Sequence, residues 1–402
     1  MHLLFVIQES GKIPSGVVSV VLEICQNWRS EDKITVYTNR LHWAGDEMSK
    51  EFVLRKGFQV KTLPFLLPSE LSFKLNTLRM NTLCVKSLKA VLKFFSWLPA
   101  LILIPYLSHW MKNNKIDVIF SHNGGWPGGE LNRWVLIAGK FASVKKNILV
   151  IHNLPANIRK VLVPWNYIMN SLIGSVCTDI ITVSNSCKIS IENDVRFGRD
   201  LKVIKNGIRI KSNIATIAQQ TSPPWQKNGL TIGFVGELHP RKGVHVLMKA
   251  FQMVKLPCEL VLIGVGEKDY TRHIEDLSRI CDHSVYFLGY REDASVLYQW
   301  LDIVVLPSLD FESFGMVLIE AMSNEKPVIC SDFGGMKEVV DHEKTGLVVP
   351  RGDSYALKNA LERLINDDAL MSRMGKEGRK RQEKDFNSLN MTRSYEKLLN
   401  EK

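Results

Sequence analysis

The sequence predicts an α/β protein with two doubly wound domains. Short apolar, β-branched runs such as 116–122 and 302–306 are expected to be buried strands, and they alternate with stretches of helical periodicity such as 244–254 and 355–365. This alternation is typical of βαβ units and a parallel sheet. In open sheets of this kind ligands bind at the carboxyl ends of the strands, so the two domains are expected to face each other across a cleft.

Composition and the positions of the prolines indicate the domain boundaries. A chain of 402 residues, of which 45% are hydrophobic, is long enough for two or three globular domains. Residues 1–207 hold the first series of strands, and 208–229, with two consecutive prolines and little apolar periodicity, are predicted to be a linker. The second series occupies 230–385, and a helix-like segment follows at 386–402.

The most informative stretch is 307–322, which reads PSLDFESFGMVLIEAM. It follows the strand 302–306 and regains helical periodicity in its second half, so it is predicted to be a turn leading into a helix. Glu312 lies at the mouth of that helix, and Glu320 lies roughly 12 Å further along its axis at ~1.5 Å per residue. Gly315 lets backbone amides approach a ligand, and a helix N-terminus favours an anion. A sugar nucleotide, with hydroxyls, diphosphate and ribose, has this layout.

The stretch that contains Glu312 and Glu320 resembles the signature of family-four retaining glycosyltransferases (glycosyl transferases group 1). Shorter segments in 231–353 agree with that family in order and approximate spacing. They are 234–238 (FVGEL), 241–243 (RKG), 264–266 (GVG), 287–289 (FLG), 334–338 (GGMKE) and 345–348 (TGLV). The resemblance implies a GT-B fold. It also implies metal-independent, retaining transfer of a hexosyl or N-acetylhexosaminyl group from a nucleotide sugar to a saccharide acceptor, in cell-surface polysaccharide synthesis and without a cofactor.

The resemblance also implies roles for individual residues. The expected catalytic residues are His152, Lys242 and Glu312. Lys242 would neutralise the charge that develops on the departing diphosphate. Glu312 would accept hydrogen bonds from the donor sugar, and Glu320 would accept them from the two ribose hydroxyls. The expected donor-binding residues are Gly16, Arg241, Lys242, Glu312, Phe314, Gly315 and Glu320.

Three further residues are placed at the carboxyl ends of first-domain strands. His122 and Asn123 end the strand 116–122 and are expected to bind the acceptor, and His152 matches the family's position for a histidine near the reacting sugar. Without the resemblance, a lone histidine at a strand end is more often structural, because its ring hydrogen-bonds loops easily. Gly16 likewise has the alternative of an ordinary β-to-α turn.

The sequence departs from the family at Glu237. Most family members have arginine at this position, in a Val-Gly-Arg-Leu motif, so the charge of a usual diphosphate ligand is reversed here. Arg241 is the candidate to replace it. The sequence does not show that the Arg241 side chain reaches the diphosphate.

Residues 52–115 carry +9 of the chain's net charge of +11, interleaved with phenylalanine, tryptophan and leucine. Their apolar run is shorter than the ~20 residues needed to span a bilayer and contains two prolines, Pro99 and Pro105. We expect this stretch to hold the enzyme peripherally on the inner, cytoplasmic face of an anionic membrane, where a lipid-linked acceptor would be presented. The alternative is that 98–107 is a buried helix or strand pair of the first domain.

Several classes of site are not expected. Seven scattered cysteines without a Cys-x-x-Cys pair predict a reduced cytosolic setting with no zinc site, and no Asp-x-Asp motif suggests a metal-bridged diphosphate. The apolar N-terminal run is too short for a signal peptide. No nucleic-acid-binding module accompanies the basic charge, so nucleic acid is not expected as a partner.

Two other functions remain open at this point. A nucleotide-sugar epimerase of the same fold would also bind a nucleotide in the cleft. A transferase with a soluble acceptor would not use the stretch 52–115 at a membrane.

Overall fold

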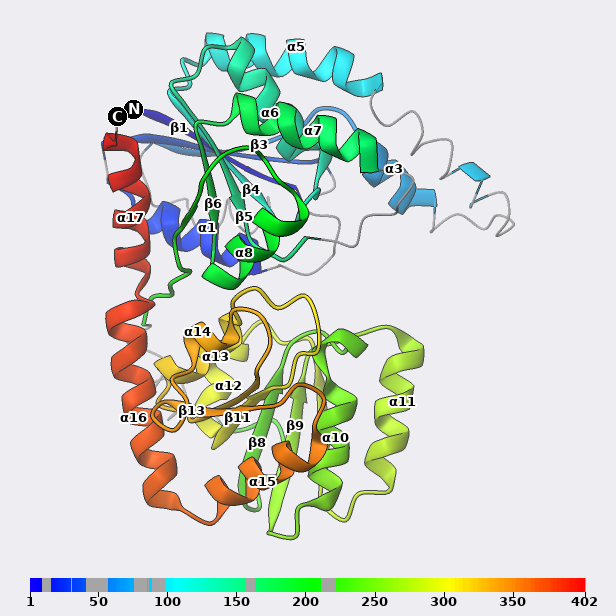
Figure 1. Cartoon of the computed structure of the whole chain (residues 1–402). Coiled ribbons are helices and arrows are strands. Elements are labelled where there is room, and N and C mark those ends of the chain that lie inside the picture. The colour runs from blue at the N-terminus through cyan, green and yellow to red at the C-terminus, as the bar shows by residue number, and fades with distance from the viewer. Residues whose placement is uncertain are drawn as a thin grey trace. The chain divides into compact units, whose positions relative to one another are not determined.

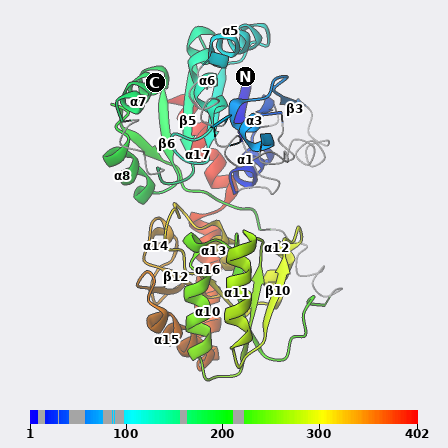
Figure 2. The same ribbon diagram turned by 90° about the vertical axis from the view of Figure 1, so that its right-hand side faces the viewer.

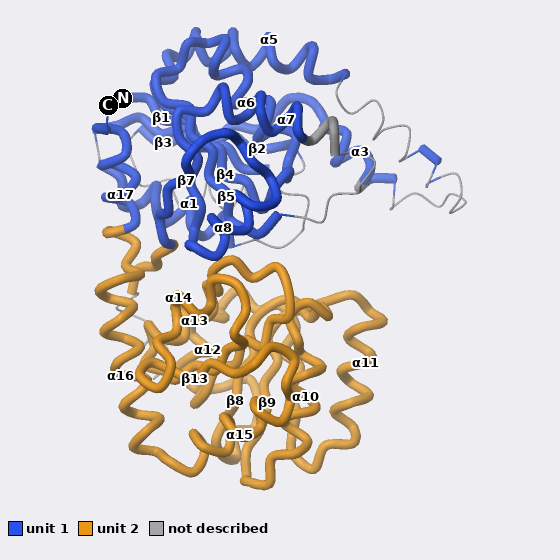
Figure 3. Tube along the Cα trace, in the orientation of Figure 1, with its two compact units in different colours: residues 1–205, 391–402 blue, residues 206–390 orange. Residues whose placement is uncertain are grey.

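The computed structural model describes residues 1–8, 16–29, 31–40, 57–75, 85, 87–88, 98–155, 163–210 and 222–401. These residues form two compact units (Figure 3). Unit 1 contains Met1–Lys205 and Met391–Lys402, and unit 2 contains Asn206–Asn390.

Unit 1 is built on a parallel sheet of seven strands in the order β3-β2-β1-β4-β5-β6-β7. The strands are β1 (His2–Ile7), β2 (Lys33–Thr38), β3 (Phe58–Thr62), β4 (Val118–Asn123), β5 (Lys146–Ile151), β6 (Asp179–Thr182) and β7 (Leu201–Val203). Strands β1 and β4 are buried along their whole length, as in parallel sheets covered on both faces. The strand order reverses between β1 and β4, and this switch point is where such sheets bind ligands.

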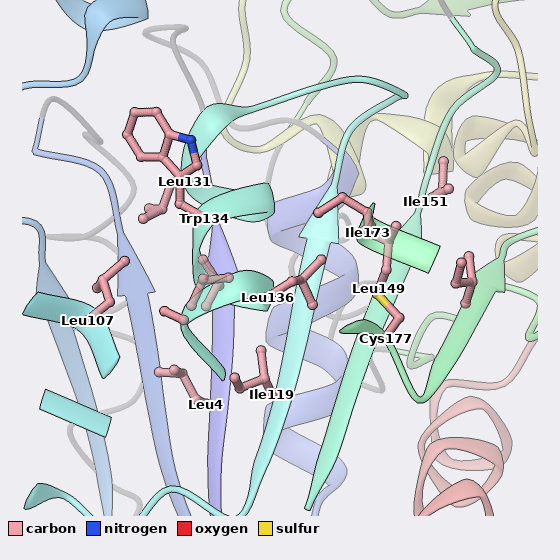
Figure 4. Packing of buried hydrophobic residues seen from close by; sticks show 14 of the residues in the cluster. Leu4, Leu107, Ile119, Leu131, Trp134, Leu136, Leu149, Ile151, Ile173 and Cys177 are labelled. Atoms are coloured by element: carbon pink, nitrogen blue, oxygen red, sulfur yellow. The ribbon is translucent and has the colours of Figure 1, made fainter. Parts of the chain in front are cut away.

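Helices cover both faces of this sheet (Figure 1). They are α1 (Gly16–Asn27), α3 (Pro68–Leu75), α5 (Leu98–Asn113), α6 (Glu130–Phe141), α7 (Val163–Val176), α8 (Asn185–Asp194) and α17 (Ser388–Asn400). On one face, Leu4, Ile119 and Leu149 of the sheet form a buried apolar cluster with Leu107 of α5 and Trp134 of α6 (Figure 4). This cluster is a hydrophobic core of unit 1.

The opposite face of the sheet is covered by α1 and α17 and has an aromatic core. The rings of Phe5 and Phe120 stack with centroids 5.0 Å apart, and Trp28, just after α1, meets Phe120 edge-on at 5.7 Å. Tyr395 of α17 is fully buried and packs edge-on against Phe120 at 5.7 Å. Residues beyond 390 therefore complete the core of unit 1.

Unit 2 is built on a parallel sheet of six strands in the order β10-β9-β8-β11-β12-β13. The strands are β8 (Leu230–Val235), β9 (Cys258–Ile263), β10 (Val285–Gly289), β11 (Ile303–Leu306), β12 (Val328–Ser331) and β13 (Gly346–Val349). The helices are η2 (Pro240–Lys242), α10 (Val244–Met253), α11 (Lys268–Arg279), α12 (Ala294–Leu297), η3 (Tyr298–Trp300), α13 (Met316–Ser323), α14 (Met336–Val339), α15 (Ser354–Ile365) and α16 (Asp368–Asp385). Helices α10 and α11 lie side by side on one face, and α13 and α16 pack together on the other (Figure 2). The switch point lies between β8 and β11.

The predicted fold class is confirmed, because both sheets are parallel and doubly wound. The runs 302–306, 244–254 and 355–365 correspond to β11, α10 and α15. The predicted turn and helix in 307–322 are also present, and α13 begins at Met316.

A buried carboxylate fixes the described end of the predicted linker to unit 2. Glu259 of β9 accepts hydrogen bonds from the Trp225 indole N–H at 3.1 Å and the Thr231 hydroxyl at 2.7 Å. Its other oxygen accepts from the backbone N–H of Asn228 at 3.2 Å. Residues 222–229 are therefore held against the sheet, whereas 211–221 lie outside the described residues.

The stretch 52–115 is only partly described, as β3, α3, α5 and short connections. Its basic residues outside the described ranges are Arg55, Lys56, Arg79, Lys86, Lys89 and Lys93. Helix α5 is half-buried: Leu103, Leu107 and Met111 face the core, while Leu101 and Ile102 are 65% and 69% exposed. Among the described helices, none is long and apolar enough to cross a membrane.

Candidate functional site

A buried ion pair lies at the switch point of the unit 2 sheet. Lys242 ends η2, which follows β8, and Glu312 lies in the loop between β11 and α13. The Lys242 Nζ atom is 2.5 Å from Glu312 Oε2, and both side chains are largely withdrawn from water. The Ser308 hydroxyl donates to the same oxygen at 3.3 Å. Two residues 70 positions apart, both predicted to be catalytic, are therefore in direct contact.

Close backbone approaches hold these loops in place. Gly243 has φ +69°, and a Cβ atom there would lie 2.0 Å from the carbonyl oxygen of Pro307. Gly334 has φ +57°, and a Cβ atom there would lie 1.8 Å from the carbonyl oxygen of Glu312. The Gly335 N–H also donates to that Glu312 carbonyl at 3.2 Å. Because a side chain at either glycine would push the loops apart, these glycines fix Lys242 and Glu312 relative to each other.

A second ion pair lies beside the first. Arg241 Nη2 is 2.7 Å from Glu237 Oε2, on a more exposed part of the same loop. The Arg241 carbonyl accepts from Leu309 N–H at 2.7 Å and from Asp310 N–H at 3.2 Å, which ties this loop to the one after β11. The departure from the family at Glu237 thus appears in the structure as a charge partner for Arg241. Lys242 and Arg241 therefore each have a carboxylate beside them.

The N-terminus of α13 directly follows the loop that contains Glu312. Gly315 caps the helix with φ +90°, a conformation that favours glycine. The Phe314 ring is buried and packs edge-on against Phe386, with centroids 5.6 Å apart. Any ligand contact of Phe314 would therefore come from its backbone, and its donor-binding role stays a prediction.

Glu320 lies one turn further along α13 and has a partner that the sequence analysis missed. The hydroxyl of Tyr298, a buried residue of η3, donates to Glu320 Oε2 at 2.8 Å. The sequence gave no signal for this contact, because Tyr298 lies before β11 in a short 3₁₀ turn and Glu320 lies after β11 in a helix. Val265, in the segment 264–266 that the sequence analysis quoted without a role, and Tyr290 follow β9 and β10 at the carboxyl edge and are 40% and 42% exposed.

In unit 1, His122 and His152 form a buried pair. His122 is in β4, and His152 directly follows β5, which pairs with β4 in parallel. His122 Nδ1 lies 2.8 Å from His152 Nε2, and the rings are nearly parallel with centroids 5.1 Å apart. Burial lowers the pKa of His152 to about 3. Burial, with a smaller effect from His152, also holds the pKa of His122 well below its usual value, so both rings are neutral near pH 7 and one donates to the other.

The surroundings of His122 are aromatic. Its ring stacks on Phe5 at 5.7 Å, and the Tyr395 ring lies 6.3 Å away. Within the described part of the chain, His122 Nε2 and the Tyr395 hydroxyl are buried without a hydrogen-bond partner. Burial also raises the pKa of Tyr395. The two histidines therefore belong to a largely apolar environment that disfavours charge.

The other predicted unit 1 residues have separate positions. The Asn123 amide donates to the Pro127 carbonyl at 3.3 Å and its oxygen accepts from Gly125 N–H at 3.3 Å, so its side chain shapes the loop after β4. Gly16 is the exposed first residue of α1, and 9–15 lie outside the described residues. In the described ranges, no group of three or more histidine, cysteine, aspartate or glutamate side chains is placed to hold a metal ion.

Comparison with known proteins gives related sequences. A family model described as glycosyl transferases group 1 matches residues 216–381. Phosphatidyl-myo-inositol mannosyltransferase of Mycobacterium leprae is 28% identical over 66% of this chain and 68% of its own length. The capsular polysaccharide biosynthesis glycosyltransferase CapM of Staphylococcus aureus is 28% identical over 58% of this chain and 64% of its own. O-antigen chain mannosyltransferase C of Escherichia coli is 32% identical over 41% of this chain and 45% of its own. The chain thus spans about half to two thirds of these curated relatives.

Solved structures match over the whole chain. HepE of Anabaena, in complex with UDP and glucose, superposes with a TM-score of 0.71 at 20% identity, covering 100% of this chain and 99% of that one. Sucrose-phosphate synthase of Thermosynechococcus elongatus gives a TM-score of 0.72 at 18% identity, with 99% and 98% coverage. At these identities the likeness establishes a shared fold.

The neutral histidine pair predicts an acid-sensitive unit 1. In the unfolded chain the two histidines bind protons near pH 6.5, whereas in the folded unit they do not. The free energy of unfolding of unit 1 is therefore unaffected above that pH and falls as the pH drops below it. The expected loss is about 1.4 kcal/mol per pH unit for each histidine. Hydrogen exchange of the β4 and β5 amides between pH 7 and 5 measures this loss.

The variant His122→Gln/His152→Gln should show a much flatter pH dependence of stability. The control His109→Gln, at an exposed position on α5, should retain the wild-type slope. An unchanged slope in the double variant would contradict the prediction.

Proposed function

We propose that this chain, which belongs to the glycosyl transferases group 1 family, moves a hexosyl or N-acetylhexosaminyl group from a nucleotide sugar to a saccharide acceptor. The family consists of retaining glycosyltransferases. The observation that carries the proposal is the Lys242–Glu312 pair at the switch point of the unit 2 sheet. A buried ammonium beside a buried carboxylate can bind two neighbouring parts of a donor, its diphosphate and its sugar hydroxyls.

The donor would lie along the carboxyl edge of this sheet. Lys242 would stabilise the negative charge of the leaving diphosphate, and the α13 N-terminus beyond Gly315 would add backbone N–H groups. Glu312 would accept hydrogen bonds from the sugar, and Glu320 from the ribose. Exposed Val265 and Tyr290 offer apolar surface for the base. HepE was solved with UDP and glucose, so UDP is the first nucleotide to test.

Arg241 is proposed as a second diphosphate ligand. Its guanidinium is already oriented by Glu237 at 2.7 Å, and a guanidinium can bind a carboxylate and a phosphate at the same time through its separate N–H groups. The reversed charge at 237 would then position the cation that replaces the usual arginine.

Transfer would proceed with retention and without a metal ion. The leaving phosphate would itself help to take the acceptor proton, and catalysis would depend on positioning and on stabilisation of that phosphate. His152 would contribute as a neutral hydrogen-bonding group, because burial keeps its pKa low. His122 and Asn123 would bind the acceptor, and Gly16 would contribute to donor binding.

The acceptor is proposed to be a lipid-linked saccharide used in cell-surface polysaccharide synthesis. Relatives named for capsular polysaccharide, O-antigen chain and phosphatidyl-myo-inositol mannose transfer support this class. Helix α5 adds support, since Leu98, Leu101, Ile102 and Tyr106 form an exposed apolar stripe and Phe65 packs edge-on against Tyr106 at 5.7 Å. With the basic charge of 52–115, this stripe suits peripheral binding to an anionic, cytoplasmic membrane face.

The function is tested by a thermal-shift screen with UDP-, GDP-, ADP- and dTDP-sugars. We expect one class to stabilise the protein, because a ligand at 100 times its dissociation constant adds ~2.7 kcal/mol to the free energy of unfolding. The stabilising donor should remain chemically unchanged when incubated alone and should lose its sugar when a lipid-linked saccharide is added. Epimer formation without an acceptor would favour the epimerase, and no stabilisation by any of the four would contradict the donor site.

Glu312→Gln should separate binding from turnover. The amide frees Lys242 and removes a negative charge near the diphosphate, so UDP should bind about three- to tenfold more tightly, equivalent to roughly 0.7–1.4 kcal/mol. Transfer should fall roughly 100-fold, because the sugar loses a charged acceptor. Isothermal titration with UDP and initial-rate assays measure the two effects.

Two matched variants control the Glu312→Gln experiment. Lys242→Met should weaken UDP binding, and Glu377→Gln, which breaks an exposed ion pair with Lys380 on α16, should change it by less than about twofold because neither partner is a proposed donor ligand. Weaker UDP binding by Glu312→Gln would show that Glu312 does not compete with the diphosphate for Lys242.

Vesicle co-sedimentation tests the membrane proposal. The protein should bind anionic vesicles, bind neutral ones much less, and be released by salt, because each basic residue near an anionic surface contributes ~1 kcal/mol. Leu101→Ser/Ile102→Ser should weaken this binding. The control is Tyr167→Ser/Ile168→Ser on α7, which removes two equally exposed apolar side chains elsewhere. Equal recovery of wild type in the supernatant with both lipids would leave a transferase with a soluble acceptor.

A further inference from the structure

Tyr298 is a buried tyrosine whose hydroxyl meets a predicted ligand-binding carboxylate. It is 1% exposed and is among the largest fully buried side chains of the chain. Its hydroxyl donates to Glu320 Oε2 at 2.8 Å. Burial, with the nearby Glu320, raises its pKa well above the usual value. The hydroxyl therefore stays a proton donor throughout the range in which an enzyme works.

The turn that carries Tyr298 is fixed to α13 independently of this contact. The Gln299 side-chain amide donates to Asn324 Oδ1 at 2.5 Å, and the Lys326 ammonium donates to the Gln299 carbonyl at 3.1 Å. The Asn324 amide in turn donates to the Glu320 backbone carbonyl at 2.8 Å. The Tyr298 hydroxyl is consequently held at a set place relative to α13, and it can act as a rigid reference for the Glu320 side chain.

A glutamate side chain loses considerable rotamer freedom when a ligand fixes its carboxylate. The hydrogen bond from Tyr298 removes part of that freedom before any ligand arrives. A carboxylate has about four lone-pair sites on its two oxygens, so it can accept the bond from Tyr298 together with bonds from other donors. Two adjacent ribose hydroxyls would be such donors.

We propose that Tyr298 is a positioning residue that holds the Glu320 carboxylate in the orientation needed to bind both ribose hydroxyls of the nucleotide donor. The inference rests on the proposed function, because it takes Glu320 to be the ribose ligand. Tyr298 would not itself touch the donor, but through Glu320 it would govern discrimination between ribose and deoxyribose nucleotides.

The test measures UDP and 2′,3′-dideoxy-UDP affinity in wild type and Tyr298→Phe by isothermal titration. Wild type should prefer UDP. Tyr298→Phe should weaken UDP about tenfold, or ~1.4 kcal/mol, and change dideoxy-UDP less than twofold. In a Glu320→Ala background, Tyr298→Phe should have no further effect on UDP, as expected for two residues that act through one contact.

Two readouts separate positioning from a structural role. Gln252→Ala removes a hydrogen bond from α10 to the Leu277 carbonyl of α11, on the opposite face of the sheet from α13; it should lower the thermal midpoint but leave UDP affinity within twofold. Tyr298→Phe should also move the acid limb of UDP binding to higher pH, because a carboxylate that loses a donor is protonated more easily. An unfolded Tyr298→Phe variant would itself contradict the proposal, since it would give the hydroxyl a structural role.

The outcomes distinguish the two levels of inference. If wild type binds none of UDP, GDP, ADP and dTDP, the proposed function fails. If it binds UDP and dideoxy-UDP equally, the ribose assignment of Glu320 fails, and the positioning role fails with it. If wild type prefers UDP but Tyr298→Phe keeps the same preference and the same acid limb, positioning alone is overturned and the donor site stands.

Discussion

The chemistry at the edge of the unit 2 sheet depends on one close backbone approach. A parallel sheet brings the loops after β8 and β11 to the same point, but contact between their side chains requires the backbones to approach more closely than Cβ atoms allow. Gly243, beside the Pro307 carbonyl, makes this possible. Lys242 precedes that glycine directly, so the crowding that excludes a side chain at 243 also places the ammonium against Glu312.

Two cations at this edge already have carboxylate partners, because Lys242 faces Glu312 and Arg241 faces Glu237. In the proposed function, an incoming diphosphate would meet these paired cations. At Lys242, donor binding would then be an exchange of partners, in which a phosphate replaces the Glu312 carboxylate, whereas Arg241 would keep Glu237. Such an exchange would weaken affinity, and the sugar hydroxyls that bind the released Glu312 would help to decide which donors bind.

Periodicity and local motifs predicted the two sheets and the turn before α13, because these depend on neighbouring residues. Contacts between side chains that are distant in the sequence could not be predicted from such patterns. The meeting of His122 and His152 depends on the register of β4 against β5, and the His122 ring packs against the aromatic core. The Phe314 ring is turned toward Phe386, and α5 proved half-buried where the sequence suggested either a membrane face or a core element. Each outcome is set by tertiary packing, which a motif does not encode.

The position of Tyr395 has a consequence for biosynthesis. Its ring fills the aromatic core of unit 1 beside Phe120, and Arg29 and Lys202 make ion pairs with Glu396 and Glu401. These C-terminal partners are translated after the whole of unit 2. During synthesis, therefore, the part of the unit 1 sheet that α17 covers stays exposed until unit 2 has been made. Apolar surface that is exposed in this way makes a nascent chain prone to aggregation.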